Sequence, residues 1–395
     1  MFKTLAALLI AGACGAAHSA ASSDHAGAAC LNPAKWYALD GAKPRAIPEA
    51  ELISDMARRE VVLLGEQHDD ADHHWWQLQT LAALHAVKPD MVIGFEAFPR
   101  RVQPELDRWS AGALGTSEFL KRVEWDKVWG FPPELYLPLL HFARINRIPV
   151  VALNVERSLT EAVGAKGWDA VPPQQREGLT RPAAPPAAYE ASLFEIYKEH
   201  ARGRATGAPA SIKDPAFRNF VEAQTTWDRA MAEALASRTK GAGAARPLAV
   251  GIMGAGHVRG GHGVVHQLRD LGVTRIGSLL AVPADTDCSA LVAPLADAVF
   301  ALPAARDETP PPRLGVRLEL RNGEVVIAAI DPGSLAARSG LQAGDVVLSA
   351  AGAPASSASS VSSAVRNTLP GTWLPLQIRR GSTTTDIIVK FPPKP

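Results

Sequence analysis

The sequence has almost no excess charge, few cysteines and, beyond its first residues, no long hydrophobic run. Its 41 basic and 40 acidic side chains leave a formal net charge of +1, which excludes the basic surface needed for binding nucleic acid. No later segment is apolar over the roughly 18 residues that a membrane-spanning helix requires. The Gly-x-Ser-x-Gly motif of covalent hydrolases is also missing. The remaining composition, 47% hydrophobic and 21% charged, is that of a globular protein with two or more domains.

The first residues have the pattern of an export signal. A lysine at position 3 precedes the apolar stretch Leu5–Ala13, which is too short to span a bilayer. We predict that residues 1–21 are a signal peptide and that the chain is exported. The segment Ala11–Cys14 resembles a bacterial lipobox without its usual leucine, so lipidation of Cys14 and ordinary cleavage near Ala17–Ala21 both stay open.

The chain has only three cysteines. If Cys14 carries a lipid, Cys30 and Cys288 remain as a pair in an oxidising compartment. The sequence does not say whether the two approach within bonding range. A disulfide and two separate thiols are therefore both compatible with the sequence.

Changes in composition and in the hydrophobic pattern along the chain indicate two domains. Residues 22–48, rich in Ala, Ser and Pro, are predicted to be a linker, and residues 49–303 a first domain. Short apolar runs at 60–64, 91–95, 149–154, 248–253 and 275–280 alternate with helical patterns. This alternation predicts an α/β domain with a doubly wound, mostly parallel sheet and helices on both faces. A Pro-rich linker, residues 304–312, follows it.

Residues 313–392 are predicted to form a small β-rich domain with short alternating strands and glycine turns. The stretch at 330–347, IDPGSLAARSGLQAGDVV, closely resembles PDZ domains. The resemblance implies that Leu314, Gly315 and Val316 form the loop that captures a peptide's C-terminal carboxylate, while the peptide adds a strand to the sheet edge. A degenerate PDZ fold that only rigidifies or dimerises the chain is the alternative, because Ser356–Ser363 offers little to line a deep pocket.

Polar side chains follow four of the predicted strands of the first domain. They are Glu66, His68, Glu96, Asn154, Arg157 and His257. Because ligands bind beyond the carboxyl ends of parallel strands, we predict that these side chains line one ligand pocket. Each alone has an ordinary alternative as a helix cap, an ion-pair partner or part of a turn. Glu and His together are the residue types of acid–base and metal sites.

Several segments of the first domain resemble the ChaN-type haem-binding uptake lipoproteins, over approximately residues 50–285. The matching pieces are Leu64–Asp69, Gly94–Glu96, Trp129–Tyr136 with Pro138, Ala152–Asn154, Gln224–Asp228 and Gly254–Val258. The resemblance implies an outer-membrane or periplasmic protein of haem or iron uptake. It further implies a non-catalytic protein that pairs haems at a homodimer interface, with tyrosinate on the iron.

Tyrosinate is an anionic oxygen donor that suits ferric haem, and the chain has only four tyrosines. Tyr37 falls in the predicted linker, which leaves Tyr136, Tyr189 and Tyr197 as iron-ligand candidates. Tyr136 matches a family position, but packing behind the strand ends explains it equally well. The sequence does not choose among the three.

The strand-end motif also looks like that of a wider superfamily of hydrolases. In that alternative the catalytic residues are Glu66, His68, Glu96 and His257. A histidine activates water, and a glutamate orients it or binds a divalent metal. The sequence contains these parts without showing their geometry.

Overall fold

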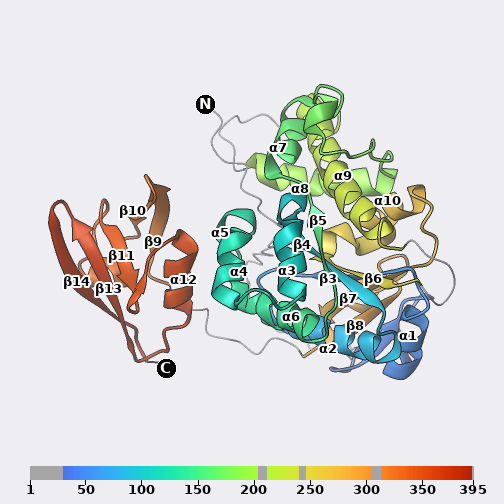
Figure 1. Cartoon of the computed structure of the whole chain (residues 1–395), viewed down its shortest axis with the longest axis horizontal. Helices are drawn as coiled ribbons and strands as arrows, with labels where there is room; N and C mark the ends of the chain where they lie inside the picture. The colour runs from blue at the N-terminus through green and yellow to red at the C-terminus, as the bar shows by residue number, and fades with distance from the viewer. Residues whose placement is uncertain (1–29, 203–210, 240–245, 304–312, 394–395) are drawn as a thin grey trace, which may run out of the picture. The chain divides into compact units, whose positions relative to one another are not determined.

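The computed structural model describes residues 30–202, 211–239, 246–303 and 313–393. They form two compact units, one made mainly of residues 30–303 and the other of residues 313–393 (Figure 1). The predicted signal peptide with Cys14 and the Pro-rich linker lie outside the described residues. Within the described ranges, no helix is both long and apolar enough to cross a membrane.

The first unit is built on an eight-stranded sheet with the order β2-β1-β8-β7-β3-β6-β4-β5. Six strands run parallel: β3 (Val61–Glu66), β4 (Met91–Pro99), β5 (Val150–Asn154), β6 (Leu248–Gly254), β7 (Ile276–Pro283) and β8 (Ala298–Leu302). Residues Val61–Leu64 are fully buried, as expected for a parallel strand covered on both faces. The predicted fold class is confirmed, and five of the six parallel strands match the apolar runs of the sequence.

The edge of this sheet corrects the prediction that residues 22–48 are a linker. The strands β1 (Trp36–Ala38) and β2 (Arg45–Ile47) pair antiparallel, and β1 pairs antiparallel with β8. Trp36 and Tyr37 are buried on β1, so the first unit begins well before residue 49. Each strand has only three residues, too few to show a two-residue period in an Ala-rich stretch.

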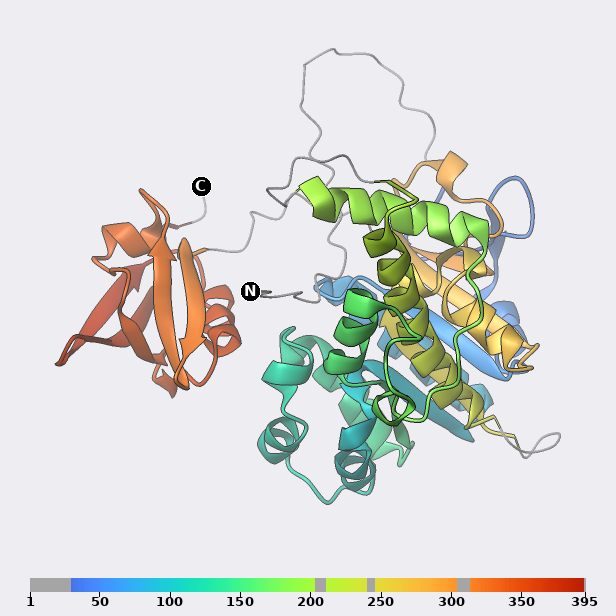
Figure 2. The same ribbon diagram turned by 90° about the horizontal axis from the view of Figure 1, so that it is seen from above.

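Helices cover both faces of the sheet. One group comprises α1 (Glu49–Met56), α2 (Ala71–Val87), α3 (Gln103–Ser110), α4 (Thr116–Arg122), α5 (Trp125–Val128) and α6 (Pro133–Ile145), with η1 (Arg100–Val102). The other comprises α7 (Arg157–Lys166), α8 (Ala187–Arg202), α9 (Pro215–Ala236) and α10 (Val264–Asp270). The two groups lie on opposite faces of the sheet, as successive side chains of β3 show. Leu63 packs with Leu235 of α9, whereas Val62 lies with Met56 of α1. The helix α8 packs across α9 (Figure 2).

The connections that carry the site are short. Helix α2 begins at its N-cap Asp70, whose carboxylate accepts from the Asp72 N–H. The segment after β6 forms the short helices η4 (Ala255–His257) and η5 (Arg259–Gly261). Two further short helices, η2 (Pro173–Gln175) and η6 (Cys288–Ala290), lie in loops.

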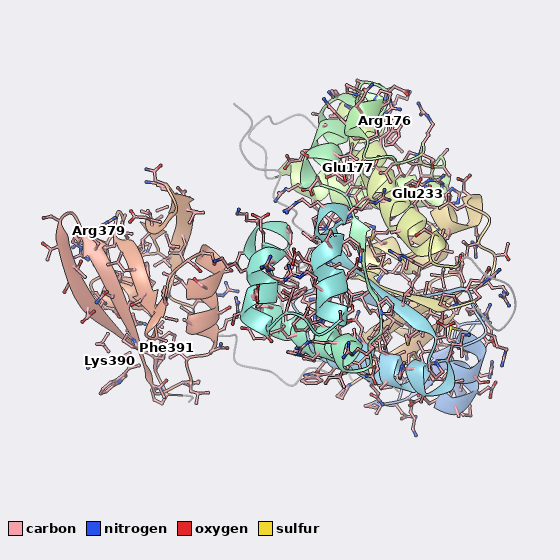
Figure 3. All side chains as sticks on the ribbon, in the orientation of Figure 1. Arg176, Glu177, Glu233, Arg379, Lys390 and Phe391 are labelled. Atoms are coloured by element: carbon pink, nitrogen blue, oxygen red, sulfur yellow. A yellow bond between two sulfur atoms is a disulfide. The ribbon has the colours of Figure 1, made fainter. Side chains whose placement is uncertain are left out.

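The second unit is an antiparallel sheet with the order β14-β13-β11-β10-β9. Its elements are β9 (Val316–Arg321), β10 (Glu324–Ile330), α11 (Leu335–Arg338), β11 (Val346–Ala350), β12 (Ala353–Pro354), α12 (Ala358–Arg366), β13 (Trp373–Arg380) and β14 (Thr383–Lys390). Phe391, labelled in Figure 3, is buried, and its N–H donates to the Thr372 carbonyl. The chain end after β14 therefore closes the apolar core of this unit.

Candidate functional site

The carboxyl ends of β3, β6 and β4 lie side by side because these strands are parallel neighbours. Glu66 ends β3, Glu96 lies near the end of β4, and Gly254 ends β6. A Cβ at Gly254 would lie 2.8 Å from His68 Nε2, far inside van der Waals contact. Glycine at this position therefore lets the His68 ring lie directly over the end of β6.

Glu66 is the centre of the first half of the cluster. Its Oε1 is 2.7 Å from His68 Nδ1 and accepts a 2.5 Å hydrogen bond from the Tyr136 hydroxyl. Burial opposes its ionisation, but the hydrogen bond from His68 and the charges of His74 and His68 lower the Glu66 pKa to about 2. Burial and the neighbouring Glu66 carboxylate raise the Tyr136 pKa well above its usual range. Glu66 is therefore a buried carboxylate, and Tyr136 a neutral donor.

His74, on the first turns of α2, completes this half. Its Nε2 donates to the His68 carbonyl at 3.1 Å, and its Nδ1 lies 3.5 Å from Glu66 Oε2. Burial disfavours the charged form of His68, but its hydrogen bond to Glu66 and the charge of Glu96 outweigh burial and raise the His68 pKa. The cationic form of His68 is thus stabilised by two carboxylates.

The second half is a chain of hydrogen bonds between Asp228 and its neighbours. His257 Nδ1 is 2.7 Å from Asp228 Oδ1, and the Tyr189 hydroxyl donates to Oδ2 at 2.9 Å. His257 Nε2 lies 3.7 Å from Glu96 Oε1, and Glu96 Oε2 accepts from the Gly254 N–H at 2.7 Å. Burial again opposes the charge, but Glu96 and Asp228 together raise the His257 pKa to about 9. His257 is an imidazolium at neutral pH.

Three buried polar atoms of the cluster have no hydrogen-bond partner among the described residues: Glu66 Oε2, His74 Nδ1 and Glu96 Oε1. Such atoms are costly to bury, so the cluster has capacity for a small donor such as water. Half-buried tryptophans lie edge-on to two of its three imidazoles, Trp129 at 4.8 Å from His68 and Trp227 at 5.1 Å from His257. In the parts of the chain described, no group of three or more His, Cys, Asp or Glu is arranged to hold a metal ion.

The structure brings together Glu66, His68, Glu96 and His257 of the predicted pocket. Asn154 supports them from β5, because its Nδ2 donates to the Glu96 carbonyl at 3.0 Å. Arg157 does not belong to the cluster. It is the first residue of α7, and its half-exposed side chain runs along the helix to Glu161. Its assignment to the pocket is therefore wrong.

Two members of the cluster were not predicted. His74 follows no strand, yet its Nδ1 lies 3.5 Å from Glu66 Oε2 and its ring lies 4.4 Å from the Tyr136 ring, tilted against it. Asp228 lies on α9, far from any strand end in the sequence, within the Gln224–Asp228 segment that matches the family. It shares the helical repeat of the buried residues Val221, Met231 and Leu235, and an acidic residue at such a position was the signal that could have revealed it.

The tyrosines do not fit the tyrosinate ligation of haem that the resemblance implied. Tyr136, Tyr189 and Tyr197 are 1%, 4% and 7% exposed, and their hydroxyls donate to Glu66, Asp228 and Asp214. Burial and the Asp228 charge raise the Tyr189 pKa well above its usual range. Tyr37 is buried as well, its oxygen accepting from the Asn32 N–H. A tyrosinate beside a carboxylate would place two negative charges together, which argues against all three candidates as iron ligands.

The remaining predicted sites lie at the N-terminus of the first unit and in the second unit. Cys30 and Cys288 form a disulfide, which settles the pairing that the sequence left open. In the second unit Gly315 has a φ of +74°, and a Cβ there would lie 2.3 Å from Ser334 Cβ, so this loop requires glycine.

The predicted peptide-binding loop, Leu314–Val316, leads into β9, the strand at the end of its sheet. Helix α12 packs near β9, and its serines have a structural role. Ser357 and Ser360 form a reciprocal capping box at the helix start.

Comparisons with known proteins agree with this architecture. The family described as haem-binding uptake, Tiki superfamily, ChaN matches residues 52–268, more than half of the chain, and the PDZ domain family matches residues 312–391. A solved structure of cofacial haem binding to ChaN of Campylobacter jejuni aligns with a TM-score of 0.52 at 19% identity, covering 67% of this chain and 96% of that one. That likeness shows the fold.

Two other solved structures align with the C-terminal part. The HtrA-type protease AlgW with a decapeptide is 23% identical over 21% of this chain and 29% of that one, with a TM-score of 0.20. The HtrA3 PDZ domain bound to a phage-derived ligand is 23% identical over 20% of this chain and 82% of that one, with a TM-score of 0.18. None of the curated proteins compared matches the chain. By its family matches, the chain belongs to the ChaN family of haem-binding uptake proteins in the Tiki superfamily and carries a C-terminal PDZ domain.

Proposed function

We propose that this protein binds haem in the bacterial envelope and serves haem or iron uptake. The observation that carries the proposal is membership of the haem-binding uptake family across residues 52–268. It is supported by a fold shared with a ChaN protein that binds cofacial haem. The signal-like N-terminus and the Cys30–Cys288 disulfide suit an oxidising compartment outside the cytoplasm. A lipid on Cys14 would hold the protein at the outer membrane, and a homodimer would place two haems together.

Titration of the purified protein with ferric haem, followed by the Soret absorption, tests this function. We expect a saturable complex. The variants Tyr136→Phe, Tyr189→Phe and Tyr197→Phe should keep it with little change in affinity, because each hydroxyl already donates to a carboxylate. Absence of saturation in the unaltered protein would exclude haem binding. Loss of the complex in one of the Phe variants would instead identify that tyrosine as the iron ligand.

The PDZ domain would recruit a partner protein by its C-terminus. Support comes from the position of β9 at the end of its sheet and from the loop before it, in which only glycine fits at position 315. A peptide carboxylate bound by the N–H groups of Leu314–Val316 would align the peptide as a further strand beside β9. The domain would thereby bring the haem-binding unit to its site of delivery.

A second candidate function is hydrolysis at the strand-end cluster, favoured by two buried oxygens that accept no hydrogen bond from the described residues, Glu66 Oε2 and Glu96 Oε1. The His257 pKa of about 9 makes that ring a proton donor at neutral pH, and the Glu66 hydrogen bond and the Glu96 charge, which raise the His68 pKa against burial, favour the same form of His68. A carboxylate would therefore take the proton of an attacking water, and His257 would protonate the leaving group. In this assignment a glutamate is the base and a histidine the acid, whereas the sequence alone suggested a histidine as the base.

The hydrolase candidate predicts that Glu66→Gln and His257→Ala each abolish any activity found in a broad screen of ester, amide and phosphate substrates. A loss of roughly a hundredfold or more is typical of removing a general acid or base. Arg157→Ala is the matched control, because Arg157 lies outside the cluster, and it should retain full activity. Equal activity in all three variants would assign the hydrolysis to a contaminant or to another site.

A further inference from the structure

The disagreement between the tyrosines and haem ligation leaves the iron ligand unassigned. All four tyrosine hydroxyls of the chain have partners inside the fold. A ligand for haem iron must present a donor atom at the surface, next to apolar side chains that cover the macrocycle. The next donor type in the chain is the imidazole. Resting on the proposed haem-binding function, we infer that haem docks on the outward face of α2 and α6 with His85 as the iron ligand.

This face is formed by one stripe of side chains from each helix. Trp75, Leu78 and His85 recur on α2 at spacings of three and seven residues, and Pro138, Phe142 and Ile145 recur on α6 at spacings of four and three. Such spacings place the members of each stripe on one side of their helix. The two helices pack side by side (Figure 1), and the His85 ring lies 5.7 Å from the Phe142 ring, almost perpendicular to it. We call these six residues the α2–α6 face.

The α2–α6 face is apolar and open. Trp75 is 56% and Ile145 is 76% exposed, and the other four residues are half-buried. None of the six carries a carboxylate. The nearest acidic residues along the two stripes, Asp72 and Glu134, lie in the first turns of α2 and α6, away from the end that carries His85. Lys88, three residues beyond His85, brings a positive charge to the same end of α2. Contiguous exposed apolar side chains are characteristic of binding surfaces.

His85 differs from the other described histidines by its place on the α2–α6 face. His68, His73, His74 and His257 are buried, and the ring of His266 bonds the Ala184 carbonyl. Among the described residues the rings of His85, His141 and His262 make no hydrogen bond, but His141 packs against Trp109 and the His262 ring lies 6.3 Å from the Tyr189 ring. Of these three, His85 is the one that lies beside the exposed apolar side chains of α2 and α6.

The imidazole supplies one axial ligand and the apolar stripes supply the macrocycle contact. A neutral imidazole nitrogen is a common protein ligand of haem iron. Packing one porphyrin face against Phe142 and Ile145 removes apolar area from water on both partners.

Ferric haem titration of the full chain, with His85→Ala, Ile145→Asp and the matched control His141→Ala, tests this inference. We expect His85→Ala to weaken binding roughly tenfold or more and to change the visible spectrum, with free imidazole restoring the original spectrum. Ile145→Asp should weaken binding and leave the spectrum unchanged, because it removes macrocycle contact and keeps the ligand. His141→Ala should match the unaltered protein, and circular dichroism should show equal folding in all four.

The outcomes separate this inference from the function on which it rests. If the unaltered protein does not saturate with haem, the haem-binding function itself is overturned, and the ligand with it. If the unaltered protein saturates and His85→Ala gives the same affinity and spectrum, the haem function stands and His85 is excluded. Equal loss in His85→Ala and His141→Ala would likewise exclude a specific role for His85.

Discussion

Replacing Cys30 and Cys288 with serine is expected to lower the free energy of unfolding of the first unit by about 4–5 kcal/mol. The two cysteines are 258 positions apart, so the disulfide closes nearly the whole first unit into a ring. Cutting a ring of this size gives the unfolded chain many more conformations. Urea unfolding followed by tryptophan fluorescence measures the loss, because eight of the nine tryptophans precede residue 304.

Unaltered protein kept in reductant is the control, and it should unfold at the same urea concentration as the double variant. The slope of free energy against urea should stay close to that of the oxidised protein, unless the released ends change the compactness of the unfolded state. A double variant that unfolds at the same urea concentration as the oxidised protein would contradict the prediction. That result would mean that the unfolded chain is already held together near these two positions.

The sheet was predictable from the sequence wherever a strand is buried on both faces. The run at 61–64 is continuously apolar because β3 has helices on both sides, and a run of this kind stands out in the sequence itself. β1 and β2 are three residues each and form the edge of the sheet, so tertiary pairing with β8 decides their conformation. A strand held by its neighbour leaves little trace in its own composition.

The site was predictable as far as parallel strands determine it. Glu66, Glu96 and His257 converge because β3, β6 and β4 end at one edge, a consequence of topology alone. The same reasoning gave the wrong place for Arg157. This residue lies beyond the end of β5 and is already the first residue of α7, so its side chain runs along the helix to Glu161. His74 and Asp228 enter the cluster from helices. A helical repeat shows which side of a helix is buried, but which strand end that side meets depends on tertiary packing that no local pattern reports.

The tyrosines show a different limit. The family resemblance supplied a ligand type, and Tyr136 matched a family position, yet its hydroxyl is bound to Glu66. A residue type suits a metal only when its donor atom is both accessible and able to ionise, and burial beside a carboxylate removes both conditions. Those conditions concern the surroundings of the side chain, and they become known only with the fold.

Replacing Asp228 with alanine is expected to destabilise the first unit by about 3–5 kcal/mol at pH 5.5, the usual effect of removing one partner of a buried ion pair. The variant leaves the His257 imidazolium without its 2.7 Å partner and the Tyr189 hydroxyl without its acceptor. Above its ordinary pKa of 6.5, a buried imidazole without its carboxylate can release its proton. The destabilisation should therefore shrink as pH rises.

The unaltered protein should show the complementary pH dependence. Folding raises the His257 pKa from 6.5 to about 9, so its contribution is complete below pH 6.5 and is lost as pH rises through about 9. Folding lowers the Glu66 pKa from 4.5 to about 2, so that contribution is complete above pH 4.5 and is lost as pH falls through about 2. Stability should therefore be greatest between pH 4.5 and 6.5.

Thermal unfolding of Asp228→Ala and the matched variant Asp270→Ala, at pH 5.5 and pH 9, measures both effects. Asp270 also pairs with a buried cation, Arg229, but its side chain is 45% exposed, so its loss should cost at most about 1 kcal/mol. Asp270→Ala should keep the fall in stability between pH 6.5 and 9, and Asp228→Ala should lose most of it. If Asp228→Ala kept the full fall, the charge on His257 would depend on Glu96 alone. The two halves of the cluster would then be joined through Glu96, with Asp228 serving only to orient the ring.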